Sequence, residues 1–141
     1  MMVFSWQFYA IASAFFAGVT AILAKMGVRD ISSDLATFIR TIVIFLLTAI
    51  ILSFKNEWSF LSKISSQAMT FLILSGLATG LSWLCYYRAL QLGPASKVAP
   101  VDKLSIVFVL IMAVIFLGEK LTIKTIIGAS LVSLGVFLLA L

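Results

Sequence analysis

The sequence predicts an all-α integral membrane protein with five transmembrane helices, and two observations carry that prediction. Of the 141 residues, 63% are apolar and only 11% are charged. Soluble domains usually have about 45–50% apolar and about 25% charged residues, and a chain this short cannot bury such an excess in one core. The apolar runs are also long and unbroken rather than alternating, which is typical of spanning helices and not of barrel strands.

The uncharged runs place the five helices along the chain. A spanning helix needs about 20 mostly apolar residues, because the hydrocarbon layer is about 30 Å thick. Two uncharged runs are long enough to span by themselves, residues 1–24 and 64–87. Two others, 41–54 and 104–118, reach that length only if neighbouring charged residues are included. The last run, 125–141, is at the lower limit. The expected helices are 3–25, 34–54, 66–90, 99–118 and 122–141. Together they form one transmembrane domain over the whole chain.

The first run is expected to stay in the protein as a helix. It has no basic segment before it, and its uncharged length exceeds the usual 7–15 residues of the apolar part of a signal peptide. The connections that follow are short. In the second connection, Lys55–Lys63, Trp58 and Phe60 are expected to anchor the chain at the membrane interface.

The basic residues leave the orientation in the membrane undecided. Five crossings place the N-terminus and the second and fourth connections on one side, with four bases, and the other connections and the C-terminus on the opposite side, with six. If Arg40 and Lys103 are counted as lying within helices, the balance is four against four. Cytoplasmic loops normally carry a clear excess of Lys and Arg. Two alternatives stay open: one orientation with the C-terminus inside, or dual topology, with copies inserted both ways.

Composition and motifs argue against several other classes of protein. There is no His and one Cys, and the five acids do not repeat at metal-ligand spacing, so we expect no metal site and no cofactor. No phosphate loop, dinucleotide fingerprint or nucleophile elbow is present, so an enzyme is not expected. The net charge of +5 comes from bases scattered at the ends of apolar runs, which favours membrane lipids and not nucleic acid as the partner.

Charged residues within the expected spans are the first candidates for function, because each costs about 2.5–3.5 kcal/mol at a helix centre. Arg40 lies six residues into the second helix. It either extends its side chain to the nearer surface or faces a polar cavity. Asp102 follows Pro100 and either starts the fourth helix at the interface or forms an ion or proton site in a broken helix.

Aromatic residues cluster near the start of the first helix and near the end of the third. Trp6 and Tyr9 form the first cluster, and Trp83 and Tyr87, beside Arg88, belong to the second. Each cluster is either an interfacial belt or part of the wall of a pocket for an apolar or cationic solute.

Residues 86–121 carry a family resemblance. The segments Tyr86–Leu90, Gly93–Ser96, Leu104-Ser105 and Phe116–Leu121 resemble the EamA domain of the drug/metabolite transporter superfamily. The first half agrees more loosely, and the likeness covers essentially the whole chain. Many such repeats have Pro in the fourth helix where this chain has Ile106.

The resemblance implies a function. Most members of this family resemble two such repeats in opposite orientations, which export or exchange small metabolites or toxic compounds. One repeat of this kind implies completion by an inverted second copy, as an antiparallel homodimer or a heterodimer, in a bacterial or archaeal cytoplasmic membrane. The solute would bind between the repeats, and alternating access would move it. A second possible function is a lipid-linked sugar flippase, which differs from this transporter only in its substrate. The alternative from another functional class is a non-transporting membrane subunit that stabilises another protein.

Candidate residues follow from that function. Those expected to line the cavity or recognise the solute are Trp6, Tyr9, Trp83, Tyr87, Arg88 and Ser105. Asp102 and Arg40 are expected to serve in coupling or polar recognition.

Overall fold

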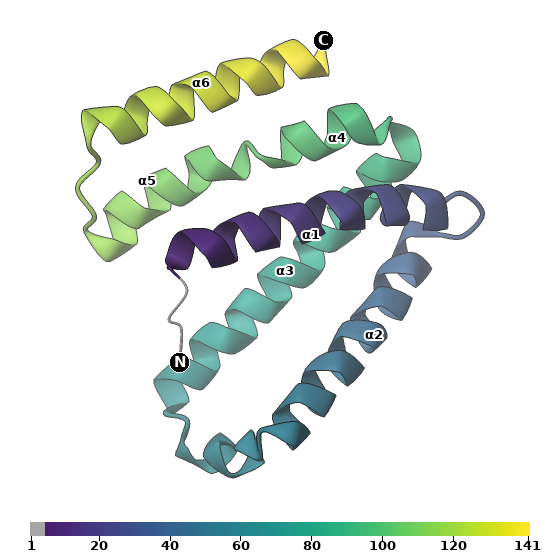
Figure 1. Ribbon diagram of the computed structural model, residues 1–141, viewed down its shortest axis with the longest axis vertical. Coiled ribbons are helices and arrows are strands. Elements are labelled where there is room, and N and C mark those ends of the chain that lie inside the picture. The colour runs from purple at the N-terminus through teal and green to yellow at the C-terminus, as the bar shows by residue number, and fades with distance from the viewer. Residues whose placement is uncertain (1–4) are drawn as a thin grey trace. The chain divides into compact units, whose positions relative to one another are not determined.

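The structure is a computed structural model that describes residues 5–141, and those residues form helices and short connections without any strand. The elements in chain order are α1 (Trp6–Gly27), α2 (Ser33–Phe54), η1 (Glu57–Lys63), α3 (Ser66–Leu92), α4 (Ala95–Asp102), α5 (Ser105–Leu117) and α6 (Ile123–Ala140) (Figure 1). With α4 and α5 taken as one interrupted span, five helices are long and apolar enough to cross a membrane. The predicted fold class, an all-α membrane protein with five spanning helices, is confirmed.

The fourth span differs most from the expected bounds. It begins at Ala95 instead of 99, directly after Pro94, whose extended backbone precedes the first turn. It is interrupted between Asp102 and Ser105, two residues after Pro100, which lies within α4. The N–H groups of Lys103 and Leu104 then donate to carbonyls three residues back, at 2.9 and 3.0 Å. The chain therefore passes from α4 to α5 through a tight turn. At the other end of the chain, the first two residues of the expected helix 3–25 lie outside the described residues.

The connection between α2 and α3 contains a short 3-10 helix, η1, that the sequence did not predict. The indole Nε1 of Trp58 donates to the Ser53 hydroxyl at 3.0 Å, and the Lys63 ammonium lies 5.0 Å from the centroid of the Phe60 ring. An aromatic ring beside a polar or charged group is suited to the boundary between lipid and water.

The described chain divides into two compact units. The central unit is Ala24–Gln91, and the terminal unit comprises the residues up to Leu23 together with Leu92–Leu141. In the central unit, α2 and α3 run in opposite directions from either end of η1 (Figure 1). Its buried side chains gather where α1 ends, α2 begins and α3 ends. They are Ala24, Val28, Ser33, Ala36, Thr37, Tyr87 and Leu90.

The terminal unit is built around α6, which packs against α4 and α5. The Lys97 ammonium of α4 lies 3.4 Å from the carbonyl of Ala140 in the last turn of α6, where a cation is favourable. The turn from α5 to α6 depends on Gly118, whose φ of +66° is a left-handed conformation. There the Glu119 N–H donates to the Ala113 carbonyl at 3.2 Å, and the Thr122 hydroxyl accepts from the Thr125 N–H to begin α6.

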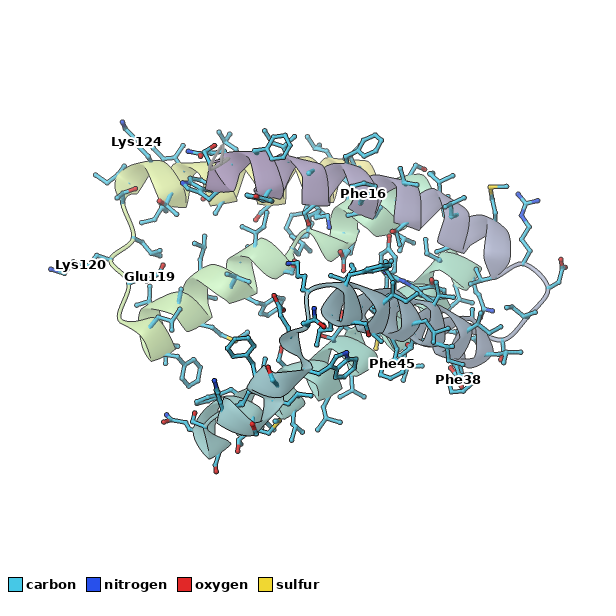
Figure 2. All side chains as sticks on the ribbon, turned by 60° about the horizontal axis from the view of Figure 1, so that its bottom comes forward. Phe16, Phe38, Phe45, Glu119, Lys120 and Lys124 are labelled. Carbon is cyan, nitrogen blue, oxygen red and sulfur yellow. The ribbon has the colours of Figure 1, made fainter. Side chains whose placement is uncertain are left out.

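Most large apolar side chains are exposed on the isolated chain. Figure 2 shows Phe38 and Phe45 projecting from α2, and both are more than half exposed, at 62% and 65%. Charged side chains gather instead at connections, as Lys120 and Lys124 do around the start of α6 (Figure 2). Such large apolar surfaces require lipid or another membrane protein to cover them.

Candidate functional site

The first half of α2 buries one of its faces. Ser33, Ala36, Thr37 and Arg40 recur at spacings of three and four residues, which place them on one side of the helix. The first three are small and buried. The Thr37 hydroxyl donates to the Ser33 carbonyl at 2.8 Å, so its polarity is satisfied within α2. Arg40 follows on the same face.

Arg40 lies against two aromatic rings of α3. Its guanidinium carbon is 4.1 Å from the Trp83 ring centroid and 5.6 Å from that of Tyr87. The two aromatic residues are four positions apart, so they present their rings on the same face of α3. The sequence leaves two alternatives for these rings, an interfacial belt or the wall of a pocket for an apolar or cationic solute, and in the structure Arg40 of the same chain lies against them.

The polar groups of this cluster are all hydrogen-bond donors or can act as donors. They are the Arg40 guanidinium, the Trp83 indole N–H and the Tyr87 hydroxyl. Within residues 5–141, none of the three side chains makes a hydrogen bond, and Arg40 has no carboxylate partner. Tyr87 is buried, at 5% exposed, and its hydroxyl oxygen is not fully enclosed.

Placing the charge of Arg40 inside a membrane-spanning helix has a free-energy cost, which the two aromatic rings help to offset. It is the eighth residue of α2, well inside a membrane-spanning helix. An arginine at a helix centre costs about 2.5–3.5 kcal/mol on insertion scales, and a cation–π contact returns about 0.5–2 kcal/mol. The two aromatic rings therefore offset much of this cost, and a negatively charged hydrogen-bond acceptor would stabilise the cation further.

Three side chains hold the neighbouring end of α3 against the chain that joins α1 to α2. The Lys25 ammonium donates to the Leu90 carbonyl. The Gln91 amide donates to the carbonyls of Ile31, at 2.8 Å, and Val28, at 3.3 Å. Arg88 in turn donates to the Gln91 side-chain oxygen at 3.1 Å. These bonds fix the end of α3 beside the start of α2, and so they position Tyr87 relative to Arg40.

The other candidate residues lie in the terminal unit. Asp102 accepts from the adjacent Lys103 ammonium at 3.2 Å, and both side chains are exposed. Ser105 is the first residue of α5, just past the interruption, and is exposed. Trp6 and Tyr9 lie in the first turn of α1 and just beyond it, exposed by 75% and 62%. The structure thus joins Arg40, Trp83 and Tyr87 in one cluster and places Asp102 near Ser105 at the α4–α5 turn.

The terminal unit also has an open apolar groove of about 490 Å³ between α5 and α6. Its only polar lining side chains are Ser130 and Ser133, and both donate to carbonyls of their own helix at 2.9 Å. The groove therefore offers apolar contact and no polar recognition. Among residues 5–141, no group of three His, Cys, Asp or Glu side chains is placed to hold a metal ion.

Sequence reasoning did not identify Lys25 and Gln91 as the residues that fix this site. Each pairs with a group at least 60 positions away, so no local pattern reveals the contact. The sequence pointed only to Arg40, as a charge within a span, and to Trp83 and Tyr87, as aromatic residues at helical spacing. It did not show that these three residues contact one another.

Comparison with known proteins identifies the family. Residues 4–141 match the EamA-like transporter family. The chain belongs to this family. A Sinorhizobium protein named as an uncharacterized transporter in the cobO 3′ region is 53% identical over 136 residues, which cover 96% of each chain. An uncharacterized protein of Methanocaldococcus jannaschii is 27% identical over 128 residues, 91% of this chain and 90% of its own length. No solved structure gives a significant match.

Membership of the EamA-like family confirms the resemblance inferred from residues 86–121 and supports a membrane transporter. The five apolar helices agree with an integral membrane protein. The two relatives are matched along nearly all of their own length, so they are of about the same size as this chain.

Proposed function

We propose that this protein transports a small metabolite or toxic compound across a bacterial or archaeal cytoplasmic membrane as an antiparallel homodimer. The observation that carries the proposal is an odd number of spans, five, with basic residues nearly balanced between the two sides. Such a chain lacks a strong signal for one orientation, so copies insert both ways. An upright and an inverted copy together form the two-repeat arrangement from which many transporters are built.

Transport in this assembly proceeds by alternating access. The solute binds between the two copies near the membrane midplane, and rocking of one copy against the other opens the site to each side in turn. The interruption between α4 and α5 supports this mechanism, because broken helices in transporters often lie at binding sites. Of the candidate residues, Trp6, Tyr9 and Ser105 contribute to the cavity wall, and Arg88 and Asp102 to polar recognition or coupling.

The test of this proposal combines orientation with transport. We expect two C-terminal fusions, one to a reporter active only inside the cell and one to a reporter active only outside, both to be active. Purified protein in liposomes is then expected to move a solute identified from a mixed metabolite pool. Activity of a single reporter would end the dual-topology homodimer. A purified protein that stays monomeric and moves no solute would support the alternative, a non-transporting subunit that stabilises another membrane protein.

A further inference from the structure

The central unit contains three side chains with hydrogen-bond donors that find no acceptor in the described chain. They are Arg40, Trp83 and Tyr87, and we call them the donor cluster. Its chemistry is one-sided, because a guanidinium and an indole N–H only donate, and a phenol is able to donate. No carboxylate of residues 5–141 pairs with the guanidinium, and none of the three side chains makes a hydrogen bond within those residues. A site built from donors and one positive charge selects an acceptor that is negatively charged.

The arrangement prepares the guanidinium for such a ligand. The rings of Trp83 and Tyr87, at 4.1 and 5.6 Å, restrict where the flexible Arg40 side chain lies. The fork of N–H donors matches the two oxygens of a carboxylate or phosphate, and a lysine ammonium does not provide that planar match. Because the rings hold the group before binding, less side-chain freedom is lost when a ligand binds.

The cluster is also accessible to a small molecule. Arg40 and Trp83 are each only partly buried, and the Tyr87 hydroxyl, which is not fully enclosed, adds a third donor. Lys25, which belongs to the same unit, adds to the positive charge near this end of α3. Since Arg40 already occupies the ring faces, a cationic solute would meet a like charge there.

We propose that the donor cluster binds the carboxylate or phosphate group of an organic anion, and that this anion is the transported solute. The claim that this anion is the transported solute rests on the proposed transport function. The claim that the cluster binds an anion does not, because all three residues lie within one unit of one copy.

The experiment uses purified full-length protein in vesicles of phosphatidylcholine, which carry no net charge. The probes are benzoate, benzamide and benzylammonium, which share a ring and differ in charge. We expect benzoate to bind about tenfold more tightly than benzamide by titration calorimetry, a ratio that one charge-assisted hydrogen bond is able to supply. Benzylammonium is expected to bind most weakly.

The variants separate a specific site from general positive charge. Arg40→Gln is expected to remove the preference for benzoate, and Arg40→Lys to retain part of it, because Lys keeps the charge without the planar fork. Arg29→Gln is the matched control: it removes the same charge from an exposed connecting residue of the same unit and is expected to leave the preference intact. If Arg40→Gln does not purify as a folded protein, the comparison of Arg40→Lys with the wild type decides the question.

Two outcomes would overturn the inference. The first is the absence of a benzoate preference, or a preference that Arg40→Gln and Arg40→Lys both leave unchanged. The second is a combined result with phosphatidylglycerol. Addition of this lipid abolishes benzoate binding, and the lipid raises the melting temperature of the wild type but not of the Arg40 variants. In that case a lipid phosphate is the anion at this site and not the cargo. Binding is measured without transport, so failure of the dimeric transport mechanism leaves these readouts interpretable.

Discussion

At the scale of single residues, the structure explains how a charge is accommodated inside a spanning helix. The two alternatives for Arg40, extension to the surface or placement toward a polar cavity, stay predictions, and the structure adds its contacts with Trp83 and Tyr87. The aromatic faces stabilise the cation within the helix pair, and its N–H donors remain free for a ligand. Asp102, by contrast, pairs with its exposed neighbour Lys103, an arrangement that contributes little to stability.

Replacement of the ring beneath Arg40 tests the stabilising part of this account. Trp83→Leu is expected to reduce stability by about 0.5–2 kcal/mol through loss of the cation–π contact. Trp83→Phe keeps an aromatic face and is expected to lose less. The apparent melting temperature of purified protein in detergent measures both. Equal losses in the two variants would show that side-chain volume, and not the attraction between cation and ring, determines the effect.

At the scale of helices and connections, the ends of the elements depend on particular backbone conformations. Gly118 ends α5 with φ of +66°, and a Cβ at that position would meet no atom within 4 Å. The need for glycine is therefore conformational and not a matter of space. Residues 102–105 show another kind of ending, in which the N–H groups of Lys103 and Leu104 donate to carbonyls three residues back and separate α4 from α5.

A pair of alanine variants tests the requirement at the end of α5. Gly118→Ala is expected to lower stability by roughly 1–2 kcal/mol, because a side chain disfavours the left-handed conformation. Gly128→Ala is the control: it lies within α6, a Cβ there also meets no atom within 4 Å, and alanine favours a helix. It is expected to be neutral or slightly stabilising in the same melting assay. A loss of stability as large for Gly128→Ala would contradict the conformational explanation.

At the scale of the whole molecule, one copy leaves most of its large apolar side chains uncovered, which lipid and a second copy are suited to cover. In the proposed homodimer, the orientation of each copy depends on a small difference in the number of basic residues, six against four along the chain. A small difference is easily changed, so a few substitutions are expected to decide which way the chain inserts.

Two oppositely biased variants test whether both orientations are required. Ser59→Lys with Ser62→Lys adds bases to the connection between α2 and α3, and Asp30→Lys with Leu92→Lys adds bases on the opposite side. We expect each double variant alone to lose most transport, because all copies insert the same way. Co-expression of the two is expected to restore it. Full activity of either double variant alone would contradict the antiparallel homodimer.

The sequence by itself determined the class of protein, because long uncharged runs have few stable arrangements other than membrane helices. It also predicted the family, through the segments within residues 86–121, and it located the charged and aromatic residues from which a site is built. Tertiary structure alone decided which of these meet. Arg40 and Trp83 lie 43 positions apart, and Gln91 bonds to Ile31 across 60, so their contacts depend on how α2 and α3 pack and not on any local pattern. The physical reason is that periodicity specifies the face on which a side chain lies, whereas packing between helices specifies the partner.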